Sequence, residues 1–369
     1  MRHGSRARMA LAGLATSGVL LLAACGASNE QAAPSGGDSG AANLSGTIAG
    51  AGASSQAAAM QAWIAGFTGV SPDAVVNYDP VGSGGGREQF IAGGTVFAGT
   101  DAYLDDEELP MAQQRCGGEV IEVPLYISPI AIVYNLDGVE ALNLAPATIA
   151  GIFAQQITNW NDPVIAADNP GVTLPDLRIT PVNRSDESGT TENFTEYLAA
   201  VAPQTWTFEP SGDWPVPGGA AAQGTSGVVG GVGGGNGTIG YADASQAGDL
   251  GVVGVGVGDE FVQPTAEAAS KVLQASPRVE SRGQFSFAYD LARDTTESGA
   301  YPIVLVSYNL ACGTYQNPAD GDLVKAFYTF VASEEGQQAA AMNAGSAPIS
   351  AELRTQLQPA IDAIGGAAS

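Results

Sequence analysis

The chain has 369 residues, with 13 Lys or Arg and 38 Asp or Glu, so its formal net charge is −25. Nucleic-acid binding depends on basic patches, and this acidic excess argues against a nucleic-acid partner. The length exceeds what one hydrophobic core normally serves, so we expect two domains.

The N-terminus predicts export and lipid anchoring. Three arginines precede an apolar run over 9–22 that is too short for a stable membrane span and is typical of a secretory signal. The run ends in Leu-Ala-Ala-Cys, which resembles the cleavage box of bacterial lipoproteins. That resemblance implies cleavage before Cys25 and lipid on its thiol. We therefore expect a signal peptide at 1–24, a flexible tether at 25–43, and a lipid-anchored location on the extracytoplasmic face of the cell membrane.

Beyond Cys25, the chain contains two cysteines and no histidine. The single histidine is His3, so the predicted mature protein lacks every catalytic or metal site that requires imidazole. Two cysteines are also too few for a thiolate zinc site. In an oxidising compartment they are most simply a disulfide between Cys116 and Cys312, although the sequence does not show that the two lie close together.

The first hundred residues alternate strand and helix signals. A strand is expected at 45–49, and a helix follows in which apolar residues recur at the helical spacing of 60, 63, 64 and 67. Further strands are expected at 74–78 and 96–99, with a helix at 87–92 between them. This alternation predicts parallel β-α-β units.

The rest of the chain carries similar signals. Buried strands are expected within 120–134 and at 302–308, and further strands at 177–183 and 237–241. The glycine cluster over 218–237 predicts loops around a short helix. Helices are expected at 147–153, from 188 to about 201, and at 323–332, 334–343 and 351–364.

Three turns rich in glycine or serine share one design. The segments 50–55, 82–86 and 184–191 each follow a predicted strand and open a predicted helix. Backbone N–H groups at a helix start lack intrahelical partners and attract anions, and Arg184 adds a fork of donors. An ordinary capped helix explains one such turn, but three together favour an anion site. None has the spacing of a Walker A loop or a dinucleotide fingerprint.

The motifs within these turns resemble a known family. They are Gly-Ala-Gly-Ala-Ser at 50–54, Gly-Ser-Gly-Gly at 82–85, Thr-Asp at 100–101 and Arg-Ser-Asp-Glu-Ser-Gly-Thr-Thr at 184–191. Supporting motifs are Ile-Thr-Asn-Trp-Asn-Asp at 157–162, Asn-Pro-Gly at 169–171 and Ile-Gly-Tyr at 239–241. From residue 44 onward, their order and spacing resemble the phosphate-binding proteins of high-affinity phosphate ABC transporters.

The resemblance implies an α/β, two-lobed type II periplasmic-binding-protein fold, with two strands crossing a hinge. One lobe would hold 44–134 and 302–369, and the other 135–301, with the crossings within 130–134 and 302–308. Inorganic phosphate would bind in the cleft and pass to the permease and ATPase subunits of an ABC importer. The resemblance implies no cofactor and no catalysis.

The resemblance also implies a set of ligand contacts. These are Ser54, Ser55, Ser83, Asp101, Arg184, Ser188, Gly189 and Thr190. Asp186 would brace Arg184 without touching the ligand. Three positions depart from the family pattern: Ser55 replaces a common aromatic, Gly84 a frequent serine, and Glu187 a usual glycine. A carboxylate at 187 is unfavourable beside an anion unless it faces solvent.

Selectivity is expected to depend on Asp101. A carboxylate can only accept hydrogen bonds, and phosphate at neutral pH retains a proton to donate, whereas sulfate has none. A site built around such a bond can reject an analogue lacking it by roughly 10⁴–10⁵.

Three other functions are possible on the sequence alone. One is a receptor for another oxyanion, such as sulfate or molybdate, which Asp101 disfavours. Another is an extracytoplasmic phosphatase, which would need a metal cluster or an activated nucleophile that these residues do not offer. The last is a structural envelope lipoprotein, which would leave the three turns unexplained.

Overall fold

The computed structural model describes residues 44–365. The predicted signal peptide at 1–24, the lipidation site Cys25 and the tether at 25–43 lie outside these residues. Within 44–365, no helix is both long and apolar enough to cross a membrane.

The first part of the chain forms the predicted parallel units. They comprise β1 (Gly46–Gly52), α1 (Ala57–Val70), β2 (Ala74–Asp79), α2 (Ser83–Ile91) and β3 (Phe97–Thr100). Strand β1 lies between β2 and β3 and pairs in parallel with both. Helix α1 buries Met60, Trp63 and Phe67, the apolar face that its spacing predicts. Because the three strands are parallel, their carboxyl ends meet at one edge, where the glycine- and serine-rich turns begin.

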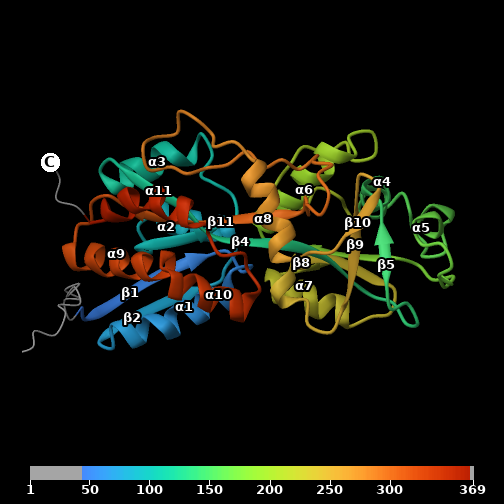
Figure 1. Ribbon diagram of the computed structural model, residues 1–369, viewed down its shortest axis with the longest axis horizontal. Helices are drawn as coiled ribbons and strands as arrows, with labels where there is room; N and C mark the ends of the chain where they lie inside the picture. The colour runs from blue at the N-terminus through green and yellow to red at the C-terminus, as the bar shows by residue number, and fades with distance from the viewer. Residues whose placement is uncertain (1–43, 366–369) are drawn as a thin grey trace, which may run out of the picture. The chain divides into compact units, whose positions relative to one another are not determined.

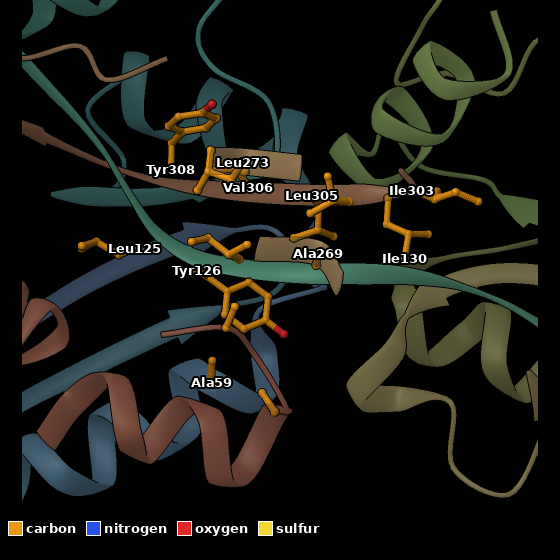
Figure 2. Close-up of a cluster of buried hydrophobic side chains, with 14 of the residues drawn as sticks. Ala59, Leu125, Tyr126, Ile130, Ala269, Leu273, Ile303, Leu305, Val306 and Tyr308 are labelled. Carbon is orange, nitrogen blue, oxygen red and sulfur yellow. The ribbon is translucent and has the colours of Figure 1, made fainter. Parts of the chain in front are cut away.

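The long strand β4 (Val120–Asn135) connects two sheets. Its first part pairs antiparallel with β11 (Val304–Cys312), and Ile130–Asn135 pairs with β8 (Thr238–Asp243). The strand order is β2-β1-β3-β11-β4-β8-β6-β7, and β4 and β11 lie side by side in Figure 1. The N–H of Ile130 donates to the carbonyl of Ile303 at 2.7 Å, and Figure 2 shows these two side chains together. The chain therefore passes between the sheets at Ile130 and returns beside it at Ile303.

The second sheet carries the third turn. Strand β6 (Thr180–Arg184) lies between β8 and β7 (Ala220–Ala222) and is parallel to both. It leads into α6 (Gly189–Val201), the helix predicted from the spacing of its apolar residues. The other elements in this part of the chain are β5 (Leu142–Leu144), α4 (Pro146–Phe153), α5 (Pro163–Asp168), α7 (Gly224–Gly233), the 3₁₀ turn η1 (Ala244–Gln246), β9 (Gly251–Val257) and β10 (Glu260–Val262).

The remaining helices are α3 (Glu108–Cys116), α8 (Ala266–Ala275), α9 (Pro318–Ala332), α10 (Glu334–Ala344) and α11 (Ala351–Asp362). The sequence predicts the last three of them. Helix α9 begins five residues before the predicted start, because the Asn317 side chain accepts from the N–H of Ala319 and Pro318 occupies the first turn. The sequence analysis identified neither α3, α5 and α8 nor β5, β7, β9 and β10.

One segment between α8 and β11 pairs with β4. The N–H of Glu122 donates to the carbonyl of Phe285 at 3.0 Å, and the N–H of Phe287 donates to the carbonyl of Glu122 at 2.9 Å. This segment belongs to the predicted lobe at 135–301, yet it hydrogen-bonds to a residue of the predicted lobe at 44–134. The lobe boundaries at 134 and 301 stay a prediction.

A disulfide joins Cys116, at the end of α3, to Cys312, the last residue of β11. Their Cα atoms are 5.1 Å apart and they are separated by 196 positions in sequence. The expected pairing is therefore present. It connects the α3 end to the strand that completes the first sheet.

Candidate functional site

The structure brings the three turns into contact. Ser83 is the first residue of α2, Asp101 follows β3, and Gly189 is the first residue of α6. A Cβ atom added to Gly189 would lie 2.7 Å from the Ser83 hydroxyl oxygen and 2.7 Å from the Asp101 Cβ. Only glycine allows α6 to begin this close to the end of β3. The helix start and the strand ends therefore converge on one place.

Asp101 is the centre of this convergence and is buried, at 3% exposed. Its carboxylate accepts hydrogen bonds from three hydroxyl groups. Ser55 Oγ donates at 2.7 Å to Oδ1 and is 2.8 Å from Oδ2, Thr190 Oγ1 donates to Oδ2 at 3.0 Å, and Ser307 Oγ donates to Oδ1 at 2.5 Å. These donors come from the β1–α1 turn, from α6 and from β11.

Neutral donors stabilise the charged form of Asp101 against the effect of burial. Burial raises the pKa of this carboxyl above its ordinary value, and the hydrogen bonds from Ser307, Ser55 and Thr190 oppose that rise. The nearby positive charge of Arg184 has the same opposing effect. Asp101 is thus a buried acceptor with hydroxyl donors on several sides.

The backbone around Asp101 is fixed as well. Its N–H donates to Ser83 Oγ at 3.1 Å, and its carbonyl accepts from Asn193 Nδ2 at 2.7 Å. Ser188 is the N-cap of α6, and its Oγ accepts from the N–H of Thr191 at 3.3 Å. These bonds hold the strand end against the helix start.

Arg184, the last residue of β6, is 3% exposed. Its Nε donates to Asp186 Oδ1 at 2.8 Å, and its Nη2 pairs with Oδ2 of the same carboxylate. Asp186 also accepts from the N–H of Gly224 at 3.0 Å. Burial acts to raise the pKa of Asp186, but its hydrogen bond with Arg184 and the charge of that residue lower it below the ordinary value. Asp186 therefore lies where a brace for Arg184 would lie.

Ser54 contacts α7 and the 3₁₀ turn η1, which belong to the part of the chain around the second sheet, instead of Asp101. Its Oγ is 3.1 Å from Thr225 Oγ1 and accepts from the N–H of Thr225 at 3.1 Å. Gln246 Nε2 lies 3.0 Å from both the Ser54 and the Ser55 carbonyl oxygens. The sequence analysis missed both Thr225 and Gln246. Thr225 lies at the start of α7, within the glycine cluster that predicted mainly loops.

The two departures at Gly84 and Glu187 are coupled in space. A Cβ atom at Gly84 would lie 1.5 Å from Glu187 Oε2, so the carboxylate occupies the space that a side chain at 84 would need. Glu187 Oε1 is 3.1 Å from Arg87 Nη2. The Glu187 side chain is 31% exposed, so it is mainly buried and paired rather than directed into solvent as the sequence analysis required.

Arg87 is itself held on several sides. Its Nε donates to Glu108 Oε1 at 2.8 Å, and its Nη1 donates to Thr100 Oγ1 at 3.0 Å. Burial raises the pKa of Glu187, and the charge of Arg87 opposes that rise. An ion pair between α2 and the third turn therefore satisfies Oε1 of the extra carboxylate, whereas its Oε2 is buried without a hydrogen-bond partner among the described residues.

Asp101 also borders a cavity of about 1000 Å³. Its lining is rich in carboxylates, which come from Asp105, Asp106, Glu107, Glu192, Glu196, Asp290 and Asp294. Two arginines, Arg282 and Arg293, also line it, but the carboxylates outnumber them, so the donors around Asp101 are better placed for an anion than the cavity is. Among residues 44–365, no group of three or more His, Cys, Asp or Glu side chains is arranged to hold a metal ion.

Comparison with known proteins places this geometry in a family. Residues 37–335 match the family model of the PBP superfamily domain. The chain is 34% identical to phosphate-binding protein PstS 3 of Mycobacterium tuberculosis, covering 96% of this chain and 98% of that protein. It is 33% identical to phosphate-binding protein PstS2 of Mycobacterium bovis, covering 95% and 97%. The chain belongs to the PstS family of phosphate-binding proteins.

Solved structures confirm the two-lobed fold expected of a PstS-family chain. A high-affinity periplasmic phosphate-binding protein, PfluDING, solved with phosphate bound, aligns with a TM-score of 0.71. The identity is 23%, over 85% of this chain and 93% of that one. A phosphate-binding protein from Stenotrophomonas maltophilia aligns with a TM-score of 0.66 at 19% identity, over the same shares of the two chains. At this identity the likeness shows the fold alone.

The PstS-family motifs did not reveal every residue around Asp101. Ser307 and Asn193 contact it directly but lie outside the three turns. Ser307 had one readable signal, because it is the single hydroxyl within the apolar run Ile-Val-Leu-Val-Ser at 303–307. Asn193 lies on α6 and is 3% exposed. A buried amide requires hydrogen-bond partners, and this burial is visible only in the structure.

Proposed function

We propose that this protein captures inorganic phosphate at the convergence of the three turns and delivers it to the permease and ATPase subunits of an ABC importer. The observation that carries the proposal is Asp101, a buried acceptor next to a helix start and several hydroxyl groups. The names of the PstS relatives support phosphate as the ligand. A protein from Clostridium perfringens, solved with bound phosphate and described as a putative phosphate ABC transporter substrate-binding protein, supports the transport role.

The proposed ligand contacts are the eight residues that the sequence analysis identified. They are Ser54, Ser55, Ser83, Asp101, Arg184, Ser188, Gly189 and Thr190. Arg184 supplies a formal positive charge, and because Asp186 engages its Nε and one side of Nη2, the Nη1 side of its planar guanidinium is the part proposed to contact phosphate oxygens. The start of α6 supplies N–H groups with no intrahelical partner. Hydroxyl groups supply the remaining donors, which suits a protein of such negative charge.

Binding requires an exchange of hydrogen-bond partners. Ser55 and Thr190 now donate to Asp101. With phosphate in place, these hydroxyls would donate to phosphate oxygens, and Asp101 would accept the proton-bearing P–OH. Sulfate would place an unprotonated oxygen against the Asp101 carboxylate. Two acceptors would then face each other without a proton, which is the basis of the proposed selectivity.

The location and the absence of catalysis are also part of the proposal. The signal peptide and Cys25 support a lipid-anchored protein on the extracytoplasmic side of the membrane. The PstS relatives are named as binding proteins, which supports a receptor rather than a phosphatase. The proposed function requires no cofactor.

Calorimetry against a panel of anions tests the proposal. The protein is unfolded, dialysed and refolded to remove any bound anion, then titrated with phosphate, sulfate and molybdate. We expect one phosphate per chain and binding of sulfate at least about 10³-fold weaker. Equal binding of sulfate, or hydrolysis of a chromogenic phosphate ester by the same preparation, would contradict it.

A further inference from the structure

Ser307 lies next to Asp101 but belongs to none of the three turns. It is on β11, where its neighbour Tyr308 pairs with Thr100 at the end of β3. Ser307 is fully buried, and its Oγ lies 2.5 Å from Asp101 Oδ1. The sheet itself, and not a turn, therefore brings this hydroxyl to the carboxylate.

The three hydroxyl donors to Asp101 differ in what else they can do. Ser55 precedes α1, and Thr190 is in the first turn of α6, so both lie at helix starts suited to an anion. Among the residues described, the Ser307 hydroxyl hydrogen-bonds to Asp101 alone. A hydroxyl has one proton to donate, so Ser307 can serve Asp101 while the other two turn toward a ligand.

We propose that Ser307 is a positioning residue for phosphate selection, which holds Oδ1 of Asp101 and leaves Oδ2 to accept the P–OH of the ligand. This inference rests on the proposed function. Thr190 and Ser55 both donate to Oδ2, so the release of the two hydroxyls on ligand binding frees that oxygen. Because Ser307 fixes the other oxygen, the carboxylate keeps its orientation during the exchange.

Ser307 also favours the anionic form of Asp101. Of the hydrogen bonds that oppose the effect of burial on the pKa of Asp101, the one from Ser307 is the largest. The other titratable groups around this carboxyl are Arg184 on β6, Tyr78 on β2, and Glu192, which lines the same cavity. Arg184 is the cation among them, and its fork is engaged by Asp186.

Loss of the Ser307 hydroxyl therefore has a specific consequence. The pKa of Asp101 rises, so the carboxyl takes up a proton at a higher pH. A protonated carboxyl can donate a hydrogen bond to sulfate, which removes the basis of rejection. Discrimination against sulfate should then fail at a higher pH than in the unmodified protein.

The test uses Ser307→Ala and Ser307→Thr in the full chain, titrated calorimetrically with phosphate and sulfate from pH 5 to 8.5. We expect Ser307→Ala to weaken phosphate binding at pH 7 about tenfold or more, and to raise the midpoint pH of discrimination by about one unit. Ser307→Thr keeps the hydroxyl and should restore both values. Ser128→Ala is the matched control, because Ser128 is also fully buried on the neighbouring strand but lies beside Asp243 instead of Asp101.

Each outcome decides the matter. Weaker binding without a change in the midpoint pH would mean that Ser307 is only structural, and it would overturn the inference. If Ser307→Ala does not fold, Ser307→Thr and Ser307→Val are compared, since they share a shape and differ in the hydroxyl. Equal midpoints in that pair would likewise overturn it. Failure of the unmodified protein to bind phosphate would instead refute the proposed function.

Discussion

Two buried aspartates, Asp101 and Asp243, occupy similar places in the two sheets. Asp101 directly follows β3, and Asp243 is the last residue of β8. Both are nearly inaccessible to solvent, and both accept hydrogen bonds from hydroxyl groups. Burial raises the pKa of both, to about 7 for Asp243.

Their hydrogen-bond donors come from different places. Asp243 accepts from the N–H of Ser245 at 3.0 Å and from Ser245 Oγ at 2.5 Å, so it caps the 3₁₀ turn that follows it. Its other partners, Tyr126 and Ser128, are both on β4, the strand that pairs with β8. Asp101 instead takes its donors from elements far apart in sequence, and Arg184 adds a positive charge.

This difference separates a structural carboxylate from a candidate functional one. The donors of Asp243 are fixed by its own turn and by the adjoining strand, so none can be released to a ligand. Two donors of Asp101 come from helix starts that can exchange partners. Burial and a raised pKa are therefore insufficient to mark a site, and the origin of the donors is the more informative observation.

The largest expected effect is on selectivity. Asp101→Asn gives the side chain donors, so it should reduce discrimination between phosphate and sulfate by about 10³-fold or more. Asp243→Asn should leave that discrimination unchanged. Competition calorimetry with both anions measures the ratio. Equal behaviour of the two variants would remove the distinction drawn between the two aspartates.

Arg184→Ala should have the next largest effect. Hydrogen bonds to charged groups contribute about 1.5–3 kcal/mol each, so loss of a bidentate contact should raise the phosphate dissociation constant about 10²–10⁴-fold. Arg184→Lys keeps the charge but loses the planar fork, so its phosphate dissociation constant should lie between those of the unmodified protein and Arg184→Ala. Direct titration measures these constants. Tight binding by Arg184→Ala would show that the anion binds elsewhere.

Asp243→Asn should change the pH dependence of stability. The pKa of Asp243 is about 7 in the fold and lower in the unfolded chain, so the native protein binds more protons between about pH 4 and 7. The contribution of Asp243 to stability is therefore present at low pH and lost as the pH rises to 7. The variant should remove this loss and gain about 2 kcal/mol relative to the unmodified protein on going from pH 5 to 8.

Denaturant unfolding at the two pH values measures that gain. Glu192, whose pKa burial also raises to about 7, titrates in the same range and leaves a residual slope in both proteins. An identical pH dependence in the variant and the unmodified protein would show that Asp243 ionises without cost in the fold.

The smallest expected effect concerns the pair of departures beside the site. A side chain at Gly84 must displace Glu187 from Arg87, so Gly84→Ser should cost less stability in a Glu187→Gly background than alone. Because the Glu187 side chain is partly exposed, we expect a coupling of about 0.5–1 kcal/mol. A double-mutant cycle by denaturant unfolding measures it. Additive effects would mean that the two departures are independent.

The sequence predicted those parts of the fold and site that carry local signals. Glycine- and serine-rich composition indicates the turns at 50–55, 82–86 and 184–191. The spacing of apolar residues in α1 and α6 predicts the buried faces of these two helices. Helix α8 carries a local signal as well, although the sequence analysis did not predict it. After the N-cap Thr265, its apolar residues recur on one face, at Ala268, Ala269, Val272 and Leu273.

What could not be predicted depends on contacts between distant residues. Ser307 and Asp101 are 206 positions apart, and Ser54 and Thr225 are 171 apart. The pairing of Glu187 with Arg87 spans 100 positions, so Glu187 alone suggested only repulsion of an anion. A motif read along the chain cannot show which strand lies beside it, and strand order decides these contacts.

The place of β11 in the sheet makes its two neighbouring strands depend on the last part of the chain. It is the last strand in sequence, yet it lies between β3 and β4 in the sheet. In any folding order that follows the sequence, it joins the sheet after every other described strand, so until then β3 and β4 each present an unpaired edge, which is prone to wrong pairing. A chain truncated before residue 304 would carry all three turns but not the strand beside Asp101. The donor from Ser307 to Asp101 is thus the last part of the candidate site along the chain, added to a site whose eight proposed ligand contacts all precede it.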